Sequence, residues 1–160
     1  WTEARCVGAL CHKPGGRCVI NDNIDIALLS GADGVHVGQD DMACAKARVM
    51  LGEGRIIGVS AHTIEEAVAA EAAGADYLGS GAAFPTNTKD VTGHYVTPEE
   101  YAAITSAVKI PVVAIGGITR DNISQLNGRG LAGVAVVSAL FAEADVEQAA
   151  REMRARCEKL

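Results

Sequence analysis

The chain has 160 residues, of which 49% are hydrophobic and 21% are charged, and its formal net charge is −6. This length and composition predict one globular domain with a sizeable hydrophobic core. The acidic balance, without any local run of Lys or Arg, excludes a nucleic-acid groove, and no apolar stretch reaches the ~20 residues that span a bilayer.

Segments typical of strands and of helices alternate along the sequence. The six predicted strands are, in chain order, Cys18–Asn21, Gly34–Gly38, Ile56–Ser60, Tyr77–Gly81, Val112–Gly116 and Gly133–Ser138. The predicted helices are Ile24–Ser30, Met42–Leu51, Thr63–Ala73, a segment that begins at Thr97, Asp121–Leu126 and Val146–Lys159. Two of them start with capping signals: Glu66 follows Thr63 at capping-box spacing, and a proline and two glutamates follow Thr97. Gly74 is placed to end the helix that Thr63 begins.

This alternation, with short connections, predicts right-handed βαβ units and a parallel sheet. An open doubly wound sheet and a (β/α)8 barrel both satisfy the pattern. A doubly wound nucleotide fold carries a glycine-rich fingerprint after its first strand, where this chain has Ile20-Asn21-Asp22. Polar or glycine residues follow nearly every strand instead, as they do at the C-terminal face of a barrel. We therefore expect an α/β fold, in which residues 1–160 form a single partial (β/α)8 TIM-barrel domain. About two of its eight units would be missing.

The loop after Phe84-Pro85 carries the strongest chemical signal. Pro85 stops the fourth strand, and Thr86, Thr88 and Lys89 then supply two hydroxyls and one ammonium. This set suits an anionic ligand such as a phosphate, although the short segment taken alone is more typical of a polar surface loop.

Two aspartates follow the first and second strands. Asp22 lies between Asn21 and Asn23, where an Asp or Asn also serves as a helix cap, and Asp41 follows Asp40 after the second strand. An Asp from each of two neighbouring strands is a usual way to hold Mg²⁺ together with the phosphate oxygens of a substrate. The pair favours metal binding, whereas either residue alone favours capping.

The remaining strand ends give weaker signals. Ser60 and His62 supply a hydroxyl and an imidazole after the third strand, and His36, inside the second, is best interpreted as a satisfied histidine of the barrel lumen. The last two strands end in Gly116-Gly117 and Ser138. In barrels these two loops often bind phosphate through backbone N–H groups and a helix N-terminus.

Six segments together resemble thiamine-phosphate synthase, in the same order and with similar spacing. They are Asn21-Asp22, Gly34-Val-His-Val-Gly-Gln-Asp-Asp41, Ile57-Gly-Val-Ser60-Ala-His-Thr63, Phe84-Pro-Thr-Asn-Thr-Lys89, Val112-Val-Ala-Ile-Gly-Gly-Ile118 and Gly133-Val-Ala-Val-Val-Ser138. The resemblance implies a (β/α)8 barrel that is a transferase. It would join hydroxymethylpyrimidine diphosphate to thiazole phosphate, giving thiamine phosphate and pyrophosphate.

The resemblance also implies roles for single residues. Asp22 and Asp41 correspond to ligands of Mg²⁺, Asn21 corresponds to a contact to the pyrimidine substrate, and Ser60 and Lys89 correspond to catalytic groups on the diphosphate. The contacts to the thiazole phosphate correspond to Thr86, Thr88, Gly117, Val137 and Ser138. Because the pyrimidine amino group can stabilise a benzylic-type cation, the reaction needs charge neutralisation on its leaving group more than it needs a protein base.

The front of the chain departs from the family. Its members begin with two further strands, the second ending in a Gln-x-Arg-x-Lys cluster that binds the diphosphate, whereas residues 1–16 are typical of a helix. The resemblance therefore implies an N-terminally truncated synthase, which we expect to self-associate through open strand edges when made alone. Two alternatives stay open: the related thiazole tautomerase, and a non-catalytic remnant that binds thiazole phosphate.

The expected partners are small-molecule substrates and Mg²⁺, not nucleic acid or membrane, and homo-oligomer formation is left open. Five cysteines is an odd number, and none of them forms a C-x-x-C pair. Reduced thiols in a cytoplasmic protein are the simplest interpretation.

Overall fold

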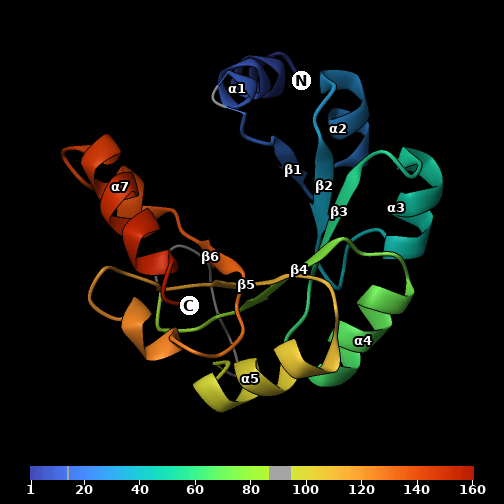
Figure 1. Ribbon diagram of the computed structural model, residues 1–160. Helices are drawn as coiled ribbons and strands as arrows, with labels where there is room; N and C mark the ends of the chain where they lie inside the picture. The colour runs from blue at the N-terminus through green and yellow to red at the C-terminus, as the bar shows by residue number, and fades with distance from the viewer. Residues whose placement is uncertain (14, 87–94) are drawn as a thin grey trace.

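The computed structural model describes residues 1–13, 15–86 and 95–160, and its described part contains one six-stranded sheet (Figure 1). The strands are β1 Val19–Asn21, β2 Gly34–Val37, β3 Ile56–Ser60, β4 Tyr77–Gly81, β5 Val112–Ile115 and β6 Gly133–Ala135. The α-helices are α1 Thr2–His12, α2 Ile24–Ser30, α3 Cys44–Leu51, α4 Ile64–Ala72, α5 Pro98–Ala107, α6 Ser138–Phe141 and α7 Val146–Cys157, and η1, Ile123–Leu126, is a 3₁₀ helix. None of the described helices is long and apolar enough to cross a membrane.

The sheet is parallel throughout, and the spatial order of its strands is their order along the chain. A doubly wound sheet reverses its strand order at a switch point, so this order rules it out. Figure 1 shows the sheet curling from β1 to β6, with α2, α3, α4 and α5 on its outer side. The fold is therefore α/β and resembles the wall of a TIM barrel.

Local signals placed several elements correctly. Thr97 begins α5 with the full capping box: its hydroxyl accepts from the Glu100 N–H, and the Glu100 carboxylate accepts from the Thr97 N–H. Thr63 caps α4 by accepting from the Glu66 N–H, at 3.2 Å. The Glu66 carboxylate, however, accepts from the His62 N–H, at 2.7 Å, instead of completing a capping box with Thr63.

The last predicted strand and one predicted helix are wrong in part. β6 ends at Ala135, three residues before the predicted end, because the chain turns at Val137 into the short helix α6. The segment predicted as a helix from Asp121 forms only η1, because the Asn122 side chain accepts from the Thr119 N–H and holds the chain in a turn.

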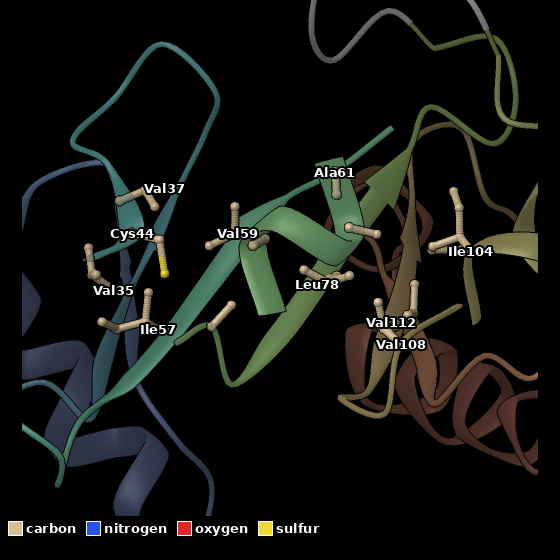
Figure 2. Close-up of a cluster of buried hydrophobic side chains, with 14 of the residues drawn as sticks. Val35, Val37, Cys44, Ile57, Val59, Ala61, Leu78, Ile104, Val108 and Val112 are labelled. Carbon is tan, nitrogen blue, oxygen red and sulfur yellow. The ribbon is translucent and has the colours of Figure 1, made fainter. Parts of the chain in front are cut away.

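The hydrophobic core lies between the sheet and its outer helices. Alternate strand residues point into it, among them Val35, Ile57 and Leu78, each with 0% of its surface exposed. Figure 2 shows these side chains in one layer along the strands, together with Val112 from β5. On the same side the Tyr101 hydroxyl of α5 donates to the Ser80 carbonyl of β4, at 2.8 Å.

Asp33 ties the first helix to the start of the sheet. Its carboxylate accepts from the Cys18 N–H at 2.7 Å and from Arg17 at 3.1 Å, and it lies 2.7 Å from His12 Nε2. The Cys18 N–H, followed by His12 and Arg17, lowers the pKa of Asp33 far below its usual range. Because the folded-state pKa lies below the unfolded value of about 4, this stabilisation is present above that pH and is lost as the pH falls.

Asp33→Asn is therefore expected to make the free energy of unfolding less dependent on pH in the acid range. The variant should be less stable than the native chain near pH 7, and the difference should shrink as the pH is lowered from about 5 to about 2. Urea denaturation at a series of pH values measures this. A constant difference between the two chains over that range would contradict the assignment.

Candidate functional site

The face of the sheet that points away from the outer helices, here called the inner face, carries the candidate site. Paired residues of parallel strands point to the same face, so the strand register defines rows across the sheet. One row runs through Asn21, His36, Gly58 and Tyr77, one residue from each of β1 to β4. Ser60 lies on the same face, two residues beyond Gly58 on β3. The sequence thus brings Asn21 and Ser60 to neighbouring ends of one face.

His36 occupies the middle of this row, as expected for a satisfied lumen histidine. Its Nε2 lies 3.0 Å from the Ser60 hydroxyl, and its Nδ1 lies 3.0 Å from the Tyr77 hydroxyl. Burial raises the pKa of Tyr77, which therefore keeps its phenolic proton at neutral pH. Ser60 is half-buried at the carboxyl end of β3.

Asp22 directly follows β1 in an unusual backbone conformation. Its φ is 65°, in the left-handed region, and it is the only non-glycine residue with a positive φ among those described. Capping does not account for it, because the cap of α2 is Asn23, whose side chain accepts from the Ile26 N–H at 2.9 Å. A left-handed conformation at an exposed carboxylate makes Asp22 a candidate functional position.

Asp41 turns back onto the end of the neighbouring strand. Its Oδ2 accepts from the Gly38 N–H at 2.7 Å, while α3 begins after Ala43. The Asp22 N–H donates to the His36 carbonyl, which continues the β1–β2 ladder one step toward Gly38. Both carboxylates therefore lie at the same ends of adjacent strands.

Two exposed carboxylates in this position fit a Mg²⁺ site that a substrate completes. Mg²⁺ is usually held by one or two carboxylates, with water and phosphate oxygens as its remaining ligands. Among residues 1–13, 15–86 and 95–160, no group of three or more His, Cys, Asp or Glu side chains gathers as a metal cage.

Thr86 and Gly117 are brought together on the far side of the same edge. The Phe84 N–H donates to the Gly116 carbonyl at 3.0 Å, so the loop after β4 follows the turn after β5. At Gly117, where φ is +63°, a Cβ would lie closer than 3.0 Å to the carbonyl oxygens of Phe84 and Pro85. Thr86 comes next in the chain. Only glycine permits this close approach.

The other predicted phosphate contacts have different outcomes. Val137 and Ser138 stand where α6 begins, and both are exposed. The first N–H groups of a helix have no intrahelical partner, which suits an anion. Thr88 and Lys89, predicted to contact the thiazole phosphate and the diphosphate, lie outside the residues that the structure describes.

The hydrogen bonds also reveal contributions that pattern reading did not find. Gln39 Nε2 donates to the Ser60 carbonyl at 2.5 Å and so joins the loop after β2 to the end of β3. The sequence pattern places Tyr77 in a strand but does not indicate its contact with His36. His62 forms a 3.2 Å pair with the Glu66 carboxylate, so it serves the start of α4. No pattern of single residues signals the first two contacts, because each depends on the register between strands.

Comparison with known proteins places this geometry in context. A model of the family described as thiamine monophosphate synthase matches residues 1–140. The thiamine-phosphate synthase of Chlorobium limicola is 47% identical over 153 residues, which are 96% of this chain and 72% of that protein. That of Moorella thermoacetica is 46% identical over 150 residues, 94% of this chain and 71% of the relative. The solved thiamine phosphate pyrophosphorylase of Pyrococcus furiosus superposes with a TM-score of 0.88 at 38% identity, covering 98% of this chain and 75% of that one.

Proposed function

Because the chain belongs to the thiamine monophosphate synthase family, we propose that the carboxyl ends of its strands bind a pyrimidine diphosphate beside a thiazole phosphate and join the two. The family assigns the general activity: the chain is a transferase of thiamine biosynthesis, of the thiamine-phosphate synthase type.

The diphosphate half of the site is assigned to β1, β2 and β3. Asn21 would contact the pyrimidine, and the Ser60 hydroxyl would donate a hydrogen bond to the diphosphate. Asp22 and Asp41 would hold Mg²⁺, which when bound neutralises charge on the departing pyrophosphate. Lys89 would add a second positive charge to the same group.

This division explains why the proposed site needs no base of its own. The pyrimidine amino group can stabilise the cation that forms as its bond to the diphosphate breaks, and the thiazole nitrogen then forms the new carbon–nitrogen bond. The protein's task is to orient two substrates and to favour the charge on the leaving group. His62 is paired with the Glu66 carboxylate at 3.2 Å, and the imidazole that lies beside Ser60 is that of His36.

The thiazole phosphate half is assigned to β4, β5 and β6. The hydroxyls of Thr86 and Thr88 would donate hydrogen bonds to the phosphate. Backbone N–H groups at Gly117, Val137 and Ser138 would complete the site. The close packing of the Gly117 turn against Phe84 and Pro85 supports this assignment, because it lets one anion reach both loops.

The observation that carries the metal assignment is the position of the two aspartates at the carboxyl ends of the adjacent strands β1 and β2. Asn23 caps α2, and Asp41 accepts from Gly38 N–H rather than from the first turn of α3. A thiazole tautomerase would not require this pair of carboxylates, and a remnant that binds only thiazole phosphate would not either. The arrangement therefore favours the synthase over both alternatives.

We also propose the domain organisation, the partners and the cellular location of the protein. Residues 1–160 would form a single domain of (β/α)8 type. Its main partners would be small-molecule substrates, and copies of the chain would associate through the open edges of the sheet. A cytoplasmic location is supported by the cysteines, since Cys6, Cys11, Cys18, Cys44 and Cys157 are all free thiols.

Titration calorimetry of Mg²⁺ with and without pyrophosphate tests the metal site. We expect Mg²⁺ to bind at least about tenfold more tightly when pyrophosphate is present, because the phosphate oxygens supply the missing ligands. Asp41→Asn should reduce that gain by roughly tenfold and leave the fold intact, since the amide oxygen can still accept from Gly38.

Asp40→Asn is the matched control, because it removes the same charge one residue earlier in the chain and should leave the pyrophosphate effect unchanged. Equal affinities for Mg²⁺ with and without pyrophosphate would remove the metal assignment. If Asp40→Asn reduced the gain in Mg²⁺ affinity as much as Asp41→Asn does, the effect would be one of general charge and not of a metal ligand.

A further inference from the structure

A connected set of hydrogen bonds crosses the inner face below Ser60. The Tyr77 hydroxyl lies 3.0 Å from His36 Nδ1, and His36 Nε2 lies 3.0 Å from the Ser60 hydroxyl. The two rings also contact each other, with centroids 5.4 Å apart. β2, β3 and β4 thus contribute one side chain each, and Ser60 is the member at the strand end where the proposed substrates bind.

Two glycines make room for the rings. A Cβ on Gly58 would overlap the Tyr77 ring and His36 Nδ1, and a Cβ on Gly79 would lie 2.9 Å from His36 Cε1. Neither glycine has a positive φ, so the site uses their lack of a side chain and not their backbone freedom. The inner face is therefore shaped to hold these two rings in contact.

The direction of the hydrogen bonds follows from the two ends of the set. The Tyr77 phenol keeps its proton, because burial raises its pKa, and it can donate that proton to His36. A phosphate oxygen without a proton only accepts hydrogen bonds, so Ser60 must donate to it and accept from His36. Both requirements are met when the imidazole carries its proton on Nε2 and accepts at Nδ1.

We propose that Tyr77 is a positioning residue, which holds His36 in the Nε2–H tautomer and thereby directs the Ser60 hydroxyl proton toward the diphosphate. The proposal rests on the proposed function in one respect, the assignment of Ser60 to the diphosphate. A donor that is oriented before the substrate arrives does not have to reorganise when charge develops on the leaving group. Tyr77 would thus act on the reaction without touching either substrate.

Tyr77→Phe tests the proposal, because it removes one hydroxyl and keeps the ring that packs on His36. Two-bond ¹H–¹⁵N spectra of protein labelled at histidine report the tautomer of each imidazole, and a His36→Gln variant identifies the signal. We expect the Nε2–H form in the native chain and a loss of that preference in Tyr77→Phe. Calorimetry should show Mg²⁺–pyrophosphate bound about fivefold more weakly, as expected for one neutral hydrogen bond.

Tyr101→Phe is the matched control. It removes a buried tyrosine hydroxyl bonded to the Ser80 carbonyl, on the opposite face of β4, and should lower stability without changing the His36 tautomer or the pyrophosphate affinity. An unchanged tautomer in Tyr77→Phe overturns the proposal, and so does an altered tautomer with unchanged pyrophosphate affinity. A failure of the proposed function would be seen separately, as a Ser60→Ala variant that binds Mg²⁺–pyrophosphate normally.

Discussion

Gly34→Ala is expected to destabilise the protein by about 3 kcal/mol or more, at the upper end of the usual cost of forcing volume into a packed region. Gly34 opens β2 and pairs with Ile56 of β3. A Cβ at this position would overlap the Ile56 carbonyl oxygen, which belongs to the backbone of the neighbouring strand. Since a backbone atom cannot rotate away, β2 and β3 would have to separate at their start. Urea denaturation should show the loss, and the midpoint of thermal unfolding should fall by roughly 6–12 °C.

Gly133→Ala is its control. Gly133 likewise opens a strand, β6, but a Cβ there would meet no atom within 4 Å. We expect that substitution to change the free energy of unfolding by less than about 0.5 kcal/mol. If the two variants were equally stable, close packing of β2 on β3 would not be the reason for glycine at residue 34.

Gly117→Ala is expected to weaken the binding of thiazole phosphate by up to ~100-fold, which corresponds to an overpacking cost of roughly 1–3 kcal/mol. The added methyl group would meet the carbonyl oxygens of Phe84 and Pro85, and the loop would have to move away together with Thr86. The turn itself cannot yield easily, because the Asn122 side chain donates to the Gly117 carbonyl at 2.9 Å. Calorimetry with thiazole phosphate measures the effect.

Gly128→Ala separates this clash from backbone strain. Gly128 has a φ of +72°, close to the +63° of Gly117, but a Cβ on it would meet nothing within 4 Å. Both variants should lose stability from the left-handed backbone, by about 1 kcal/mol. Only Gly117→Ala should lose affinity for the phosphate. Equal affinities in the two variants would show that the loop after β4 does not need the Gly117 turn.

Much of the fold was predictable because its signals are local. β3, β4 and α2 have the predicted bounds. For α2 the signals are a capping residue, Asn23, before the helix and Gly31 after it. The helix start at Thr97 was predicted from four consecutive residues, whereas the capping box was predicted at Thr63 and is found at Thr97. Parallel strands place their carboxyl ends at one edge, so the position of Asp22, Asp41 and Ser60 at the same ends of β1, β2 and β3 also followed from the order of elements.

The rest depends on geometry that a linear pattern does not contain. Tyr77 and His36 are 41 positions apart. Their contact depends on the register of β2, β3 and β4. The N–H groups of His62 and Thr63 are one residue apart, and the Glu66 carboxylate accepts from that of His62. The turn into α6 was missed because its residues continue the apolar run of β6.

The inner and outer faces of the sheet impose opposite demands on successive residues. On the outer face Val35, Ile57 and Leu78 fill space, whereas on the inner face Gly58 and Gly79 leave it free. β3 and β4 therefore combine positions that need bulk on one face with positions that exclude it on the other. Under the proposed placement of the pyrimidine beside Asn21, a redesign for a larger pyrimidine would gain no space at these glycines, which have no side chain to lose. Extra volume would have to come from the two rings, at the cost of the hydrogen bonds that orient Ser60.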